Sequence, residues 1–386
     1  MTKEALRIGF IPLVDAAALI VASDLGFAAK EGLKIELIRE ASWSNIRDRL
    51  ALGHLDAAHM LTPMIVASRL KINQLRAPLA AVVNLALNGN AITVSPALHA
   101  EIKAEVDGDI DDPAASAAAL ARVVRKREAR GEEPLTFGMT FPFSTHNYQL
   151  RHWMAAGGVD PDRDLRLVVL PPPLMAESLA KGLVDGFCVG APWNSVAVAA
   201  GLGAILHLGC EILSHAPEKA LAMREGAPEE DKERTAALIR AIVAGAQYAE
   251  DPANRGEVAA SLARPERIGV DTEHISRTLE GRLRIDAEGA ERRRDDYLLL
   301  ARGGACRPEP VRGAWLYAQA LRWGQAHFQP DDLAAARGAM CADLFDAAIG
   351  GPSAAGGAAP GVFSGEVFEE GDVRAYVNGF RIGAKI

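Results

Sequence analysis

The chain has 386 residues, of which 49% are hydrophobic and 24% charged, and this predicts a soluble globular protein with two domains or one enlarged domain. Its formal net charge of −8 gives no general attraction to nucleic acid or to an anionic membrane, so an anionic ligand would need a local site. The four cysteines lack the spacing of a zinc or redox site, and no apolar run reaches transmembrane length.

Strands and helices alternate from the start of the chain. The hydrophobic pattern predicts a strand near 6–12, a helix over 15–30, a strand over 33–40, a helix over 43–52 and a strand over 56–61. The same order returns at 135–141, 145–157, 165–170, 173–182 and 185–190. Between these units, residues 80–95 form a β-rich stretch interrupted by Asn-Gly-Asn, and residues 101–134 are predicted to be helical.

The two units also share sequence. ALGHLDAAHMLTPM at 51–64 and AKGLVDGFCVGAPW at 180–193 have Ala, Gly, Asp and Pro at equivalent positions, at one offset of 129 residues. Such a repeat predicts an α/β fold with two similar lobes, parallel strands and a ligand cleft where the strands end. Asp56 and Asp185 occupy the same place in both units, which favours a structural turn over paired acid–base chemistry.

The repeat also suggests domain boundaries. We expect lobe I to comprise 1–92 and 205–350, including a set of C-terminal helices, and lobe II to comprise 93–204. The stretch 80–95 would cross from the first lobe to the second. Residues 351–386 are expected to form a linker and a tail, because GGPSAAGGAAPG at 350–361 has a linker composition.

TFPFSTHNYQLRHW at 140–153 places His146 at the start of a predicted helix, beside two hydroxyl residues. A helix N-terminus carries unpaired N–H groups and attracts anions. The alternative is that Ser144 or Thr145 caps the helix and His146 lies on the surface. The repeat places this turn at the predicted cleft. The chain contains no Gly-x-Ser-x-Gly, His-Glu-x-x-His or Walker A motif, so binding is better supported than catalysis and we do not expect an enzyme.

Six motifs make the sequence resemble a known family. They are ASWSNIRDRL (41–50), LTPM (61–64), LNGNAITV (87–94), FPFSTHNYQLRHWMAAGG (141–158), GAPWN (190–194) and HAPEKAL (215–221). In this order they resemble the nitrate-binding protein family, which includes solute-binding components of nitrate and bicarbonate ABC transporters and cytoplasmic nitrate/nitrite sensors of the NasS type. The resemblance covers roughly residues 5–350 and implies a two-lobed type II periplasmic-binding-protein fold, with an interlobe ligand cleft and an added C-terminal helical region.

The resemblance also implies the residues of an oxyanion pocket: Trp43, Asn90, His146 and Lys219. Lys219 would supply the countercharge, His146 and Asn90 hydrogen bonds, and Trp43 a flat surface with an N–H donor. Transporter members carry Gln where this chain has Asn90, so the amide here reaches one methylene less far. Thr145 and Ser44, at two predicted helix starts, are further candidate donors.

Retention of a charged residue at Lys219 favours nitrate or nitrite as the ligand, with no metal and no cofactor. In the bicarbonate branch, the resemblance implies that this position loses its charge and that a metal assists binding.

The N-terminal sequence MTKEALRIGFIPL enters a predicted strand almost at once and does not look like an export signal, so we expect a cytoplasmic protein. The resemblance to NasS-type sensors then implies that the anion releases an ANTAR-type antitermination response regulator of the NasT type, without direct contact with nucleic acid or membrane. Two alternatives stay open: an exported substrate-binding component of a nitrate/nitrite, bicarbonate or cyanate ABC transporter, and an enzyme on this scaffold such as a thiamine-pyrimidine synthase relative.

Overall fold

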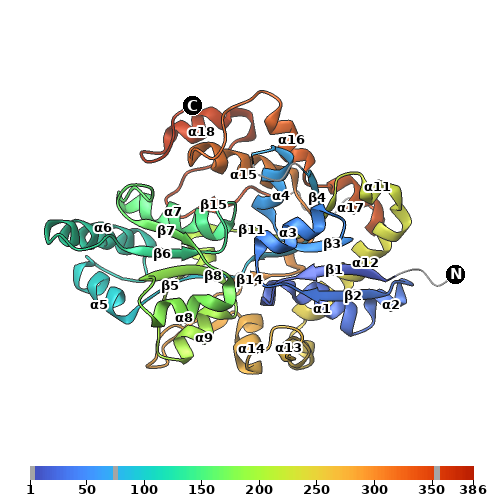
Figure 1. The fold of residues 1–386 in the computed structure, drawn as a ribbon, viewed down its shortest axis with the longest axis horizontal. Coiled ribbons are helices and arrows are strands. Elements are labelled where there is room, and N and C mark those ends of the chain that lie inside the picture. Colours follow the sequence, from blue (N-terminus) through green and yellow to red (C-terminus); the bar gives the residue numbers. More distant parts are fainter. Residues whose placement is uncertain (1–4, 73–76, 352–356) are drawn as a thin grey trace.

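Two β-sheets flanked by helices organise the part of the chain that the computed structural model describes, which is residues 5–72, 77–351 and 357–386 (Figure 1). The six-stranded sheet has the order β14-β4-β11-β3-β1-β2, and the five-stranded sheet has the order β7-β6-β8-β5-β9. Each sheet forms the centre of one lobe. Figure 1 shows the two lobes side by side, with the C-terminal helices α15, α16 and α18 along one edge.

The predicted repeat is confirmed element by element. The first unit consists of β1 (Leu6–Phe10), α1 (Ala17–Asp24), α2 (Phe27–Lys30), β2 (Ile35–Arg39), α3 (Trp43–Ala51), β3 (Ala57–Leu61) and α4 (Thr62–Arg69). The second consists of β6 (Thr136–Met139), α7 (Thr145–Gly157), β7 (Arg166–Val169), α8 (Met175–Ala180), β8 (Gly186–Gly190) and α9 (Trp193–Ala199). β1 pairs in parallel with β2 and β3, and β6 pairs in parallel with β7 and β8, as crossover helices require.

The repeated aspartates have the structural role that their positions predicted. Asp56 Oδ2 accepts a hydrogen bond from the backbone N–H of Arg7 at 2.8 Å, and Asp185 Oδ2 accepts one from Thr136 N–H at 2.8 Å. In each lobe the carboxylate therefore satisfies a backbone donor at the start of the unit's first strand.

The stretch that was predicted to cross between the lobes does so within a few residues. β4 (Leu79–Asn88) belongs to the first sheet and β5 (Asn90–Val94) to the second. Gly89 between them has a φ of +93°, a left-handed conformation that favours glycine. This turn places Asn90 at the boundary between the lobes.

The predicted domain boundaries differ from the sheets at two places. β9 (Ala204–Leu208) and all of β5 pair in the second sheet, although residues 205–208 and 90–92 were assigned to lobe I. The chain returns to the first sheet through α10 (Gly209–Ile212) and β10 (Leu213–Ser214), which lead to β11 (Pro217–Arg224). Alternating apolar residues identify a strand, but they do not specify the sheet to which it pairs.

The remaining segments cover the sheets. Lobe II also contains α5 (Pro96–Glu105) and α6 (Pro113–Ala129). Residues 225–350 are mostly helical and contain three short strands. The elements are α11 (Ala227–Glu230), α12 (Lys232–Glu250), α13 (Arg255–Ala263), α14 (Thr272–Glu280), β12 (Arg282–Arg284), β13 (Glu291–Arg293), β14 (Leu298–Leu299), α15 (Pro310–Arg322), α16 (Asp332–Gly338) and α17 (Ala342–Ile349). No helix within the described ranges is both long and apolar enough to span a membrane.

The tail is integrated into the fold. Residues 352–356, in the predicted linker, lie outside the described residues. Beyond them, β15 (Gly361–Val362) pairs with β10, and α18 (Val373–Gly379) contacts α15, where Tyr376 Oη accepts a hydrogen bond from Trp315 Nε1 at 3.2 Å.

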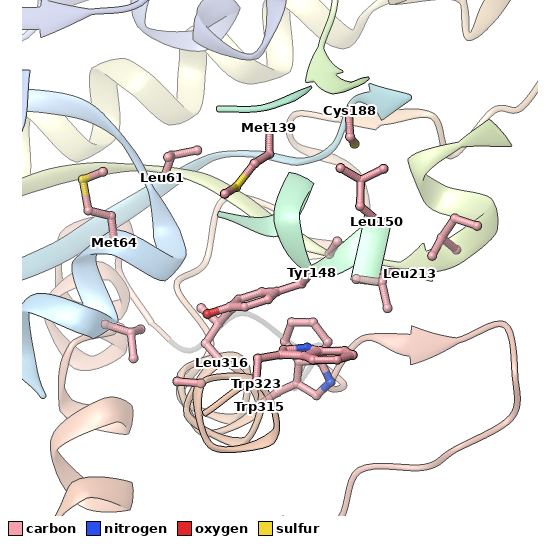
Figure 2. Packing of buried hydrophobic residues seen from close by; sticks show 14 of the residues in the cluster. Leu61, Met64, Met139, Tyr148, Leu150, Cys188, Leu213, Trp315, Leu316 and Trp323 are labelled. Carbon is pink, nitrogen blue, oxygen red and sulfur yellow. The ribbon is translucent and has the colours of Figure 1, made fainter. Parts of the chain in front are cut away.

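Helix α7 is held in place along most of its length. Its residues from Thr145 to Ala155 are buried, and Figure 2 shows Tyr148 of this helix facing Trp315 and Leu316 of α15. The rings of Tyr148 and Trp315 meet edge to face, with centroids 6.5 Å apart. This packing fixes the helix N-terminus that carries His146.

Candidate functional site

A group of buried polar side chains lies where the two lobes meet. We call it the interlobe cluster. Its members come from strands of both sheets, from the N-terminal turns of α3 and α7 and from the turn after β1: Asp15, Trp43, His59, Asn90, His146, Gln149, Glu218 and Lys219. Each is at most 2% exposed. Buried polar groups are costly unless they are paired, so this concentration marks the strongest candidate for a binding site.

Lys219 is the charged centre of the cluster. It belongs to β11, and its Nζ lies 2.8 Å from Asp15 Oδ2 and donates to Glu218 Oε1. The ammonium also lies 5.3 Å from the centroid of the Trp43 ring, a cation–π contact. Burial disfavours the charge, but the two carboxylates together raise the pKa of Lys219 above its ordinary value. The same ammonium, with His59, holds the pKa of Asp15 far below its usual range despite burial.

His146 lies at the start of α7. Ser144 caps this helix by accepting a hydrogen bond from Asn147 N–H at 3.1 Å, as one alternative predicted. The surface position that this alternative gave His146 is wrong, because the imidazole is completely buried. Its Nδ1 lies 3.0 Å from Thr140 Oγ1, and its Nε2 lies 3.4 Å from Glu218 Oε1. Burial lowers the pKa of His146 to about 4, despite the Glu218 carboxylate, so the ring is neutral near pH 7.

Asn90 lies beside a second amide, that of Gln149. Its Nδ2 donates to Glu218 Oε2 at 2.6 Å and to Gln149 Oε1 at 3.1 Å. Gln149 comes from α7, one helical turn beyond His146. The amide position is therefore a pair, and the longer side chain of Gln149 accompanies the shorter Asn90.

Trp43 is the first residue of α3, whose N-cap is Ser42. The indole is buried and meets the His59 ring edge to face, with centroids 5.4 Å apart. Within the described residues, Trp43 Nε1, His146 Nε2 and Gln149 Nε2 have no hydrogen-bond partner. An unpaired buried N–H group costs about 1–3 kcal/mol, so a ligand oxygen that accepted from these groups would remove a penalty.

The two further candidate donors fall outside this arrangement. Thr145 Oγ1 is buried and already donates to the carbonyl of Pro217 at 3.0 Å, which ties α7 to β11. Ser44 lies on the exposed side of α3, and the capping hydroxyl is that of Ser42. The structure thus brings Trp43, Asn90, His146 and Lys219 together, while Thr145 joins the lobes and Ser44 lies apart.

Sequence reasoning missed four members of the cluster: Asp15, His59, Gln149 and Glu218. Glu218 was visible within HAPEKAL, and Asp15 lies in the first-unit turn that the repeat had placed at the cleft. His59 lies 2.9 Å from Asp15 Oδ1 through Nε2 and was set aside for lack of metal-ligand spacing. A search for groups that attract an anion overlooks carboxylates. Within the described ranges, no three His, Cys, Asp or Glu side chains are arranged as metal ligands.

Comparison with known proteins assigns the chain to a family. The profile described as the NMT1-like family matches residues 1–263. The nitrate/nitrite binding protein NrtA of Synechococcus elongatus is 31% identical, with 99% of this chain and 87% of the relative covered. The bicarbonate-binding protein CmpA of the same organism is 27% identical, with 86% of this chain and 74% of the relative covered. The chain spans about half the length of the ATP-binding transport proteins that it also matches.

One solved structure is similar over nearly the whole chain. It is the periplasmic nitrate-binding protein NrtA from Synechocystis PCC 6803, with a TM-score of 0.88, 27% identity and 98% of each chain covered. The predicted periplasmic-binding-protein fold is therefore confirmed. The C-terminal helical region falls within the covered length, so it is part of the shared architecture.

Proposed function

This chain belongs to the NMT1-like family and is related to NrtA-type binding proteins, and from this premise we propose that it binds nitrate or nitrite in the interlobe cluster. The observation that carries the proposal is a fully buried Lys219 in one cluster with side-chain nitrogens of Trp43, His146 and Gln149 that have no hydrogen-bond partner among the described residues. Its named relatives bind nitrate, nitrite or bicarbonate, which fits binding without turnover.

The chemistry of the cluster suits a small planar oxyanion. Removing such an ion from water requires a countercharge and directional donors, which Lys219 and the N–H groups supply. Because the cluster residues are at most 2% exposed, the anion reaches them only when the lobes separate. Closing the lobes around the ligand would then remake contacts such as that of Thr145 with Pro217.

Calorimetric titration tests the binding step. Wild-type protein is expected to bind nitrate and nitrite, and His146→Ala is expected to weaken binding about 10- to 100-fold, because one hydrogen bond to a charged ligand is lost. The matched control is His274→Ala, since His274 is half-buried on α14 and lies outside the cluster; its affinity should be unchanged. Equal affinities for all three proteins would refute the site, and tighter binding of bicarbonate would refute the ligand.

We assign the binding step to a cytoplasmic sensor of the NasS type, which releases an ANTAR-type antitermination regulator of the NasT type when the anion binds. The six motifs resemble the family as a whole, which includes such sensors, so they are compatible with the assignment. The net charge of −8 also fits a protein that leaves RNA contact to its partner and has no membrane role of its own. The alternative, a substrate-binding component of an ABC transporter, is favoured by the likeness to NrtA and CmpA.

Release of the partner distinguishes the two roles. Purified protein mixed with the regulator is expected to elute as a complex in size-exclusion chromatography and to separate when nitrate is added, because the closed form has lower affinity for the partner. His146→Ala should form the same complex and keep it in nitrate. A complex that ignores nitrate would exclude the sensor role, and nitrate-dependent binding to a permease in vesicles would establish the transport role.

A further inference from the structure

The charges within the interlobe cluster do not favour an anion as they stand. Asp15 and Glu218 are both within ion-pairing distance of Lys219, so one ammonium faces two carboxylates. Both Glu218 oxygens face donors, Lys219 on one side and Asn90 on the other, which is the arrangement of an ionised, acceptor-only carboxylate. The two histidines are neutral, because burial lowers the pKa of each. The cluster therefore carries a net charge of −1 before any anion binds.

An added anion would bring this buried charge to −2, and repulsion between buried like charges is weakly screened. Nitrate is too weak a base to carry a proton itself. The compensating charge must therefore come from a protein group that gains a proton. Each oxygen of Glu218 and Asp15 already faces a donor, so a proton on either carboxylate would meet another donor. The remaining groups in the cluster are His59 and His146.

Hydrogen-bond partners distinguish these two histidines. His59 Nδ1 accepts a hydrogen bond from Ile11 N–H at 3.4 Å, and a backbone N–H cannot turn into an acceptor. A proton on that nitrogen would face another donor, so His59 is locked in its neutral form with Nε2 directed at Asp15. His146 differs, because its Nδ1 faces the hydroxyl of Thr140 at 3.0 Å. A hydroxyl donates or accepts by rotating, so both protonation states of His146 are satisfied.

We infer that anion binding in the interlobe cluster draws one proton from water onto Nδ1 of His146, and that the Glu218 carboxylate makes this proton necessary. The inference rests on the proposed function. In the protonated state, Nδ1–H donates to Thr140 Oγ1, and Nε2–H lies between Glu218 and the ligand. The charged groups that face His146 are Glu218 and Lys219 from β11 and Asp15 from the turn after β1. The proton adds one positive charge, so the cluster becomes neutral before it accepts the anion.

The sign of the pH dependence follows from this scheme. Burial between the closed lobes lowers the pKa of His146 to about 4, and an anion bound beside the ring raises it by favouring the charged form. Between the two pKa values, affinity falls about tenfold for each unit of rising pH, and about one proton is taken up per bound anion.

Proton uptake is measured directly. Weakly buffered protein at pH 6 is titrated with choline nitrate, which supplies no alkali cation, while a pH-stat records the acid needed to hold the pH. Wild type is expected to take up close to one proton per bound nitrate, and its Kd should rise with pH from 5.5 up to the pKa of His146 in the bound state. Glu218→Gln, which removes one charge with little change of shape, should bind nitrate without proton uptake and with a Kd that changes less than twofold over that range. Glu309→Gln is the control, since Glu309 is a buried carboxylate that pairs with Arg307, and it should behave as wild type.

Nitrate binding by wild type without proton uptake would overturn the inference. Nitrate binding that occurs only when sodium or potassium is present would overturn it as well, because the cation would then supply the charge. Absence of nitrate binding by the wild type in all these solutions would instead overturn the proposed function.

Discussion

Lys219→Met is expected to abolish detectable nitrate binding and to lower the free energy of unfolding by about 3–5 kcal/mol, the usual cost of removing one partner from a buried ion pair. The substitution removes the positive charge that Asp15 and Glu218 share and leaves both carboxylates buried without it. Calorimetry with nitrate measures the binding loss, and urea unfolding measures the stability loss.

Two further variants separate these effects. Adding Asp15→Asn to Lys219→Met removes one uncompensated charge, so it should restore part of the stability while binding stays absent. Lys181→Met serves as the control, because Lys181 and its partner Glu177 are both more than half exposed and such pairs contribute less than about 1 kcal/mol. Nitrate binding at wild-type affinity by the Lys219→Met protein would show that the ligand does not need this ammonium.

Trp43→Ala is expected to lower the free energy of unfolding by about 3–5 kcal/mol, because it removes a fully buried indole from the core. Trp43→Phe tests the separate role of the indole N–H. It keeps an aromatic ring against His59 and Lys219 but removes a buried donor that has no partner in the described part of the chain. We therefore expect only a small loss of stability and a roughly tenfold weaker affinity for nitrate.

The control for the indole is Trp323→Phe. Trp323 is also buried, and its Nε1 likewise lacks a partner among the described residues, but it belongs to the C-terminal region and not to the cluster. Its substitution should leave nitrate affinity unchanged. If Trp43→Phe binds nitrate as tightly as wild type, the indole contributes packing alone and makes no hydrogen bond to the ligand.

Much of the architecture follows from local patterns. The two copies of the repeat gave the elements of both lobes within a few residues, because hydrophobic periodicity and turn residues act over short distances along the chain. The boundaries near β5 and β9 were less accurate, since strand pairing joins residues that are far apart in sequence. The same limit applies to the candidate site. The motifs predicted four residues that the structure places together, Trp43, Asn90, His146 and Lys219, but not the carboxylates of Asp15 and Glu218 that pair with Lys219.

The sequence by itself determined a two-lobed α/β chain with Asn90 on the crossing strand and His146 at a helix start in the second lobe. Only the tertiary structure decided the electrostatics of the cluster. β11 lies between β3 and β4, and this register places Lys219 opposite Leu61 and brings it to Asp15, more than two hundred residues earlier in the chain. Burial then makes each charge dependent on its partners, and that dependence exists only once the lobes have met.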